Sequence, residues 1–376
     1  MSRFCTFALL IAVCVAAVAS GQETAKQPLP DVPSTNKQEE TVASPPSFEL
    51  PSRARIVPPT LPRELRATER QVLVAPPFSS EGEAQCDEGG AAYFHVLTGG
   101  STKNPTIFKL GHSQDEHLLY KLPSEIPDKK SAFYTACSVT PAGRLWVLVE
   151  EWVGEEPKVA AYGFDSKGAV KSEIHLETPA RLLPRHFAAF DNEVFFVEGD
   201  VSVTAGTPKT SRPYAAIVNG SGEVTRELNL NLQGLQVQKG RIPQGAAVAG
   251  RDGNLYMLLP DQVLVVTQSG ETLRKLTFSK PDREALATGI SLSGGLIAIH
   301  VMEQRKHTLD LTLVLLDANT GDEIGYYRPD AELGNNAICF SRTEGFTFLG
   351  VAKGSLDGGL TVIPRFRTAM RYRMLR

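Results

Sequence analysis

Residues 249–278 read AGRDGNLYMLLPDQVLVVTQSGETLRKLTF, and this stretch decides the fold. Three short apolar runs alternate with turns that contain Gly, Pro or Asp, and no helical spacing links the apolar positions. The runs at 255–259 and 263–266 are apolar at successive positions, which is typical of strands buried on both faces. We therefore interpret the stretch as a strand, a loop, a second strand, a Gly turn and a third strand.

The same pattern recurs along the chain. Units of strand, tight turn, strand, loop, strand, Gly turn and strand are expected to start near residues 84, 135, 186, 246, 288 and 337. Their spacing of roughly 40–60 residues is the range in which propellers and other repeat arrays occur. The second strands of the units read DGNLYMLL (252–259), GGAAYFHVL (89–97), AGRLWVLVE (142–150), DNEVFFVEG (191–199), GGLIAIHVM (294–302) and EGFTFLGVA (344–352).

Six units of four strands predict an all-β fold, a six-bladed β-propeller of four-stranded antiparallel blades. Two packed β-sandwiches are the alternative, but they would not explain a sixfold recurrence. The last unit lacks a clean fourth strand, whereas ERQVLVAPP at 69–77 is a strand pattern that precedes the first unit. We expect this N-terminal strand to close the last blade, because pairing both chain ends removes open sheet edges.

The phrase RDGNLYML, followed by VLVVTQSGE, resembles blades of six-bladed propellers with NHL and TolB-like repeats. The resemblance covers roughly residues 84–368 and implies the propeller fold. Lactonases and lyases share that fold, so the resemblance also admits an enzyme, a hydrolase or lyase with an ion in the central channel. A shared fold does not by itself assign an activity.

The N-terminus predicts export. Residues 1–20 carry an early positive charge, an apolar run and small residues at Ala17 and Ala19, the pattern of a cleaved signal peptide. Residues 21–65 are rich in proline and poor in aromatic residues, which indicates a disordered linker. Residues 66–376 are assigned to the propeller. We expect a secreted or periplasmic protein with no transmembrane segment after signal cleavage.

Composition and motifs exclude some function classes. The net charge of −3 offers no general attraction for nucleic acid, so no nucleic-acid partner is expected. No GxxxxGKS, HExxH, CxxC or GxSxG motif occurs. Because no aligned acid–base set marks a catalytic centre, we favour a binding or interaction module over an enzyme. A scaffold held at the cell envelope by its linker is a further alternative.

Four carboxylates share one position in consecutive units. Each carboxylate lies eight residues after the turn residue of its unit, where we expect the second strand to leave its sheet. Oxygen-rich arcs suit Ca²⁺ or a cationic ligand, so calcium is the cofactor that this arc would favour. Solvated loop ends also attract acidic residues, which is the competing explanation. The candidate ligand-binding residues are Glu151, Asp200, Asp261 and Glu303.

Two histidines and three cysteines also share positions between units. His95 and His300 each lie five residues after a turn Gly and are candidate metal ligands, His300 together with Glu303. Buried core histidines are the alternative. Cys86, Cys137 and Cys339 are expected on innermost strands. We expect buried thiols, with at most one pair bridged between adjacent blades.

The loops between second and third strands predict the working face. They are long and polar at 98–105, 199–212 and 303–309. Insertions on one face of a repeat array often build its binding face. We therefore expect a protein or small-molecule ligand on this long-loop face, although drift in unselected loops would give the same pattern.

Overall fold

The computed structural model describes residues 67–97, 106–111, 116–122, 131–153, 156–202, 211–228, 246–282, 284–304, 309–328, 336–343, 345–351 and 365–374. These residues belong to one compact unit, Arg55–Arg376. The predicted signal peptide and nearly all of the predicted linker precede this unit and lie outside the described residues. Among the described residues, no helix is long and apolar enough to cross a membrane.

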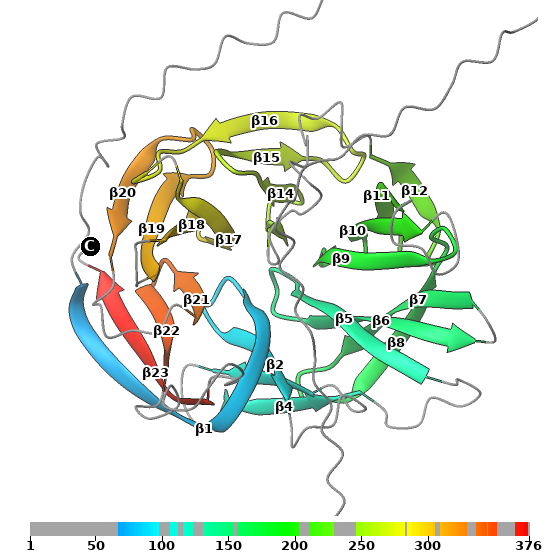
Figure 1. Ribbon diagram of the computed structural model, residues 1–376, viewed down its shortest axis with the longest axis horizontal. Coiled ribbons are helices and arrows are strands. Elements are labelled where there is room, and N and C mark those ends of the chain that lie inside the picture. The colour runs from blue at the N-terminus through cyan, green and yellow to red at the C-terminus, as the bar shows by residue number, and fades with distance from the viewer. Residues whose placement is uncertain are drawn as a thin grey trace, which may run out of the picture. The chain divides into compact units, whose positions relative to one another are not determined.

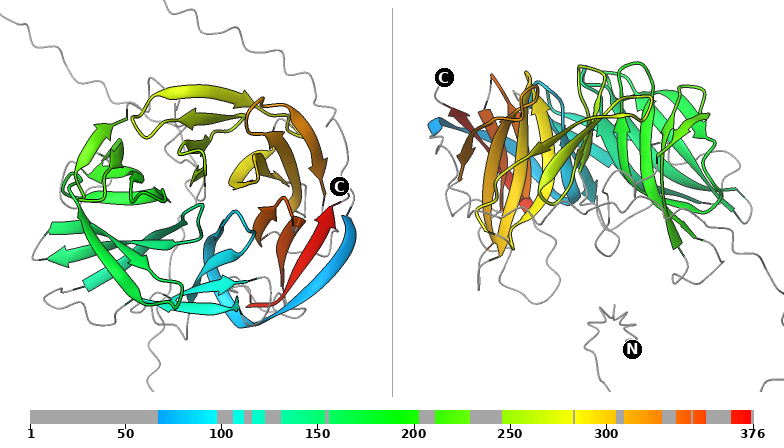
Figure 2. Two further views of the ribbon diagram at one scale, coloured as in Figure 1. Left: turned by 180° about the vertical axis from the view of Figure 1, so that it is seen from behind. Right: turned by 90° about the horizontal axis from the view of Figure 1, so that it is seen from above.

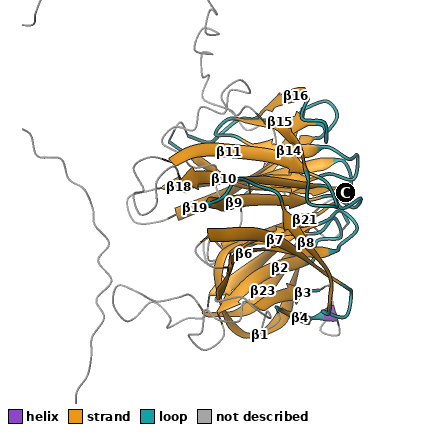
Figure 3. Ribbon diagram, turned by 90° about the vertical axis from the view of Figure 1, so that its right-hand side faces the viewer, coloured by secondary structure: helices purple, strands orange, loops and turns teal. Residues whose placement is uncertain are grey.

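The described residues form 23 β-strands arranged as a propeller (Figure 1). Four sheets have four strands each, and every strand in them is antiparallel to its neighbour. Figures 2 and 3 show these sheets from behind, from above and from the side, with most loops at the ends of the strands. The first sheet consists of β5 (Ser131–Val139), β6 (Leu145–Val153), β7 (Glu156–Phe164) and β8 (Val170–Leu176), and the second of β9 (Leu182–Ala189), β10 (Phe195–Ser202), β11 (Ser211–Val218) and β12 (Val224–Glu227). The third sheet consists of β13 (Ala247–Ala249), β14 (Leu255–Leu258), β15 (Gln262–Val266) and β16 (Thr272–Thr277). The fourth consists of β17 (Leu286–Ser293), β18 (Leu296–Gln304), β19 (Leu309–Asp317) and β20 (Glu323–Tyr327).

The fifth sheet has seven strands in the order β21-β22-β23-β1-β2-β3-β4. It corrects the expected count, because the described residues form five hydrogen-bonded sheets and not six. Its strand β1 is long enough to pair with two partners, so the first and last predicted units merge into one sheet. The strands are β1 (Ala67–Cys86), β2 (Ala92–Leu97), β3 (Thr106–Leu110), β4 (Leu118–Lys121), β21 (Asn336–Ser341), β22 (Gly345–Val351) and β23 (Arg365–Met374).

Strand β1 pairs with both β23 and β2. Its first part, from Ala67 to Ser79, lies antiparallel to β23, and its second part, from Ser79 to Cys86, lies antiparallel to β2. Within the predicted strand 69–77, residues 69–74 therefore pair with β23.

Packing between sheets explains why so many strands are apolar at successive positions. All four residues of β14 are buried, and alternate residues serve different cores. Leu255 and Met257 pack toward β9–β12, whereas Tyr256 and Leu258 pack toward β17–β20. Because each face of the strand packs against another sheet, both faces carry apolar residues. The sequence therefore shows no alternation of polar and apolar positions there.

A disulfide joins Cys86 at the end of β1 to Cys339 in β21, across 253 sequence positions. Cys137 in β5 is buried and is not bridged. Burial raises the pKa of its thiol to about 11. The expectation of at most one bridged pair is confirmed. Cys137 and Cys339 are buried as expected, whereas Cys86 is only partly buried.

Candidate functional site

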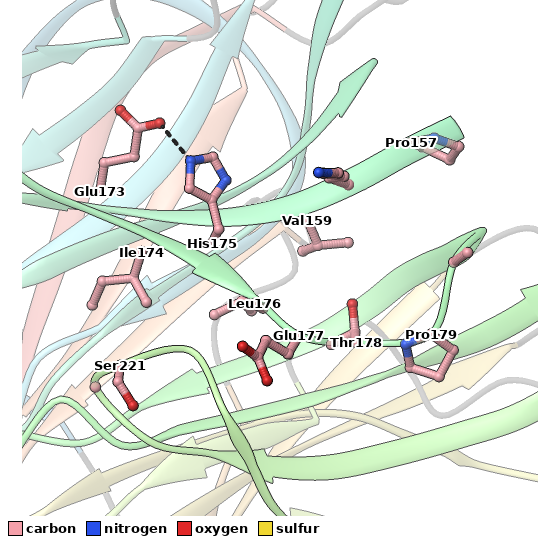
Figure 4. A pocket seen from close by; sticks show the side chains of 13 residues that line it. Pro157, Val159, Glu173, Ile174, His175, Leu176, Glu177, Thr178, Pro179 and Ser221 are labelled. Carbon is pink, nitrogen blue, oxygen red and sulfur yellow. Dashed lines mark ion pairs between the residues drawn. The ribbon is translucent and has the colours of Figure 1, made fainter. Parts of the chain in front are cut away.

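A groove of about 570 Å³ runs along β8, the outermost strand of the β5–β8 sheet (Figure 4). Its walls come from the start of β7, from β8 and the connection that follows it, and from the turn between β11 and β12. Polar and apolar side chains both line it. The lining residues used below are Lys158, Glu173, His175, Glu177, Ala180 and Ser221.

The alternation along β8 explains the mixed lining. Ile174 and Leu176 are buried, while Glu173 and His175 are exposed, because successive side chains of a strand point to opposite faces. Ile174 and Leu176 belong to the core shared with β9–β12. The packing of Ile174 and Leu176 into this core therefore fixes β8 and turns Glu173 and His175 to the opposite face.

The turn between β11 and β12 lies directly over the end of β8. The Glu177 N–H donates a hydrogen bond of 2.7 Å to the carbonyl oxygen of Gly222. Gly222 has a φ of +91°, and a Cβ added to it would lie 1.9 Å from the carbonyl oxygen of His175. Only glycine fits this approach, so the turn sets one wall of the groove.

Behind the groove, Glu151 of β6 is fully buried, with 0% of its side chain exposed. The hydroxyl of Tyr162 on β7 donates a hydrogen bond to Glu151 Oε1. Burial, followed by the contact with Glu151, raises the pKa of Tyr162, so its hydroxyl stays protonated and can act as this donor. Tyr162 thus orients one oxygen of the carboxylate.

His175 lies between two carboxylates. Its Nδ1 is 3.7 Å from Glu151 Oε2, and its Nε2 is 3.1 Å from Glu173 Oε1. The strand register allows this meeting, because Ala160 lies opposite His175 and its small side chain leaves room between β6 and β8. One donor atom from each of the three residues lies within 4.8 Å of the others.

The four carboxylates aligned by sequence have separate surroundings. Asp200 of β10 pairs with Arg185, and Asp261 is exposed in the turn between β14 and β15. Glu303 of β18 is buried, and its Oε1 accepts hydrogen bonds from Thr312 at 3.2 Å and Arg328 at 3.4 Å. Within the described part of the chain, the donor cluster found contains Glu151 but none of the other three.

The two aligned histidines differ from each other. The His95 ring stacks on Tyr134 with 4.0 Å between ring centroids. His300 is buried, and burial lowers its pKa to about 4, so the ring is neutral at pH 7. His300 and Glu303 are three positions apart on β18 and so point to opposite faces of the sheet, away from a common ion.

Sequence alignment of the units missed Glu173 and His175, and it also missed a buried pair. His186 of β9 and Glu198 of β10 lie opposite each other, and the His186 Nδ1 contacts the Glu198 carboxylate. The two residues Glu173 and His175 share a face because they are two positions apart. That spacing can be read from the sequence, but the strand register that brings the two residues to Glu151 cannot.

The three long loops fall largely outside the described residues, but β10 is described to its end. The N–H of Ser202, the last residue before the undescribed 203–210, donates to the carbonyl oxygen of Arg181 at 3.3 Å. Arg181 follows Ala180 of the groove lining. The described end of β10 therefore lies beside the groove.

Comparisons with known proteins show neither a family nor a function for the chain. No known protein family matches the sequence, and no curated protein matches it either. Among solved structures, a protein of unknown function from Bacteroides caccae is 14% identical with a TM-score of 0.41, covering 68% of this chain and 84% of that one.

Two further solved structures are similar to the chain. A luciferin-regenerating enzyme is 11% identical with a TM-score of 0.45, covering 81% of this chain and 95% of that one. A putative gluconolactonase is 12% identical with a TM-score of 0.43, covering 83% of this chain and 96% of that one.

Proposed function

We propose that the chain is an exported β-propeller that acts as a binding module, and that the groove along β8 receives a positively charged part of its ligand. One observation carries the proposal. The groove displays Glu173 and Glu177 beside His175, with the buried Glu151 carboxylate behind them. Lys158 is the one Lys or Arg among the described lining residues, so carboxylates outnumber cations there.

Charge of one sign in a concave surface attracts a partner of the opposite sign. The Glu151 carboxylate is buried, so water screens its field less than that of the exposed Glu173 and Glu177. Such a field raises the rate of association and selects against acidic ligands. The sequence predicted a cationic ligand from an acidic arc, and the proposal places that charge in the groove instead.

The position of the groove links it with the predicted long-loop face. The hydrogen bond between Ser202 and Arg181 puts the end of β10 beside the connection after β8. We infer that the binding surface includes the described end of β10.

The disulfide between Cys86 and Cys339 supports export, because disulfides persist in oxidising compartments. We also infer that the propeller is of the NHL type and that β1 closes its ring. The change of partner at Ser79, from β23 to β2, supports the closure, because it joins strands from both ends of the propeller in one sheet.

A peptide titration tests the proposed function. A lysine-rich peptide should bind the chelator-treated full chain at low salt, whereas a glutamate-rich peptide of equal length should not. Glu177→Gln should weaken binding about two- to fivefold, since one exposed ion pair contributes about 0.2–1 kcal/mol. Glu271→Gln, at an exposed turn far from the groove lining, is the matched control. Equal binding of both peptides, or no effect of Glu177→Gln, would refute the proposal.

A further inference from the structure

We propose that Glu151, Glu173 and His175 form a binding site for a first-row transition-metal ion, and that Zn²⁺ fits it best. The three residues come from β6 and β8 of one sheet, with donor atoms within 4.8 Å of one another. This site is at the outer edge of the sheet and does not depend on a basic ligand in the groove.

The donor set selects the class of metal. One imidazole nitrogen and two carboxylate oxygens match a Zn²⁺ site with three protein ligands and a water molecule. Ca²⁺ instead takes 6–8 oxygen ligands and is rarely bound through imidazole. The cluster therefore favours Zn²⁺ over the calcium that the sequence suggested for the arc containing Glu151. Co²⁺ and Ni²⁺ accept similar donors.

Glu151 supplies a fixed ligand. Burial of a carboxylate is costly unless hydrogen bonds or a cation compensate its charge. Tyr162 donates to Oε1. Oε2 is on the side of His175, at 3.7 Å from Nδ1. A metal ion at this side would compensate the charge more fully than a partly exposed imidazole does.

His175 and Glu173 supply adjustable ligands. Their side chains are 55% and 41% exposed, so both can change rotamer without displacing core residues. Tetrahedral Zn²⁺ with bonds of about 2.1 Å needs donor atoms roughly 3.4 Å apart. The donors of the cluster lie within 4.8 Å of one another, so closure by at most about 1.4 Å suffices. Metal binding would then replace one of the contacts that His175 makes with the two carboxylates.

Tyr162 acts as a positioning residue for the metal ligand Glu151. Hydrogen bonds to a ligating carboxylate fix its orientation, and their loss commonly lowers metal affinity about 10–100-fold.

Calorimetry with ZnCl₂ on the chelator-treated full chain tests the inference. The expected result is one high-affinity site per chain, and visible absorption of bound Co²⁺ should report nitrogen and oxygen coordination. His175→Gln should weaken binding more than about tenfold, Glu151→Gln likewise, and Tyr162→Phe about tenfold. Because His175 is 55% exposed, its variant should keep the wild-type melting temperature in the absence of metal.

Matched controls separate this site from other outcomes. His95→Gln and Glu271→Gln should keep the wild-type affinity for Zn²⁺ within about twofold, because neither residue belongs to the donor cluster. No Zn²⁺ binding by the wild type, or unchanged binding by a correctly folded His175→Gln, would overturn the proposal. Glu177→Gln should leave Zn²⁺ affinity unchanged, because Glu177 is outside the donor cluster, while it weakens binding of the lysine-rich peptide. The two proposals can thus fail separately.

Discussion

Cys86 and Cys339 are covalently joined, although 253 positions separate them in the sequence. The bond connects the end of β1 with β21, which lies on the other side of β23 and β22 in the same sheet. It therefore encloses almost the whole propeller in one covalent loop. A cross-link of this length removes much of the conformational freedom of the unfolded chain.

Replacing both Cys86 and Cys339 with Ser should lower the free energy of unfolding by about 2–5 kcal/mol. Chemical unfolding followed by fluorescence would measure the change. A reductant should lower the stability of the wild type to a similar level and leave the double variant unaffected. A double variant as stable as the wild type would show that the loop constraint contributes nothing.

Gly222→Ala should lower the free energy of unfolding by about 3 kcal/mol, because it combines backbone strain with a steric conflict. The glycine has a φ of +91°, and the added Cβ would lie 1.9 Å from the carbonyl oxygen of His175. Gly295→Ala is the matched control, with a φ of +77° and nothing within 4 Å of its Cβ. It should cost only about 1 kcal/mol.

Equal losses for Gly222→Ala and Gly295→Ala would mean that the turn can move away from β8. The wall of the groove would then be adjustable, and peptide binding should tolerate Gly222→Ala. If the turn is fixed, the variant should also weaken binding of the lysine-rich peptide, since the Glu177 N–H bonds to this glycine.

The propeller could be predicted from sequence because its strands are short and their turns recur. The number of sheets could not. The sequence predicted the N-terminal strand only over 69–77, and Pro76 and Pro77 at its end cannot donate hydrogen bonds within a sheet. In the structure, β1 continues to Cys86, and the register shifts between Val74 and Phe78. An irregularity of the ladder thus accommodates the prolines, and one strand serves two predicted units.

The candidate site was predictable only in part. Counting from turn residues singled out Glu151, but strand lengths differ between sheets, so equal counts do not give equal environments. β14 ends at Leu258, which leaves Asp261 in a turn, whereas β6 continues to Val153 and carries Glu151 inside the sheet. The neighbours of Glu151 depend on the registers of β6 with β7 and of β7 with β8, which no local pattern encodes.

His300 should make the protein sensitive to acid. Burial lowers its pKa from 6.5 to about 4, so the imidazole binds a proton less readily in the folded state than in the unfolded chain. Above pH 6.5 the ring is neutral in both states and contributes no pH dependence. As the pH falls below 6.5, the unfolded state gains protons first and stability is lost, until the folded state also protonates near pH 4.

His300→Leu should remove this loss, because leucine does not titrate. Relative to the wild type, the variant should gain about 2–3 kcal/mol of unfolding free energy on going from about pH 7.5 to about pH 4.5. Urea unfolding of both proteins at the two pH values measures the difference. His117, whose pKa burial also lowers, is present in both proteins, so its contribution cancels in the comparison. Parallel pH profiles would show that the imidazole of His300 takes up its proton as readily in the folded state as in the unfolded chain.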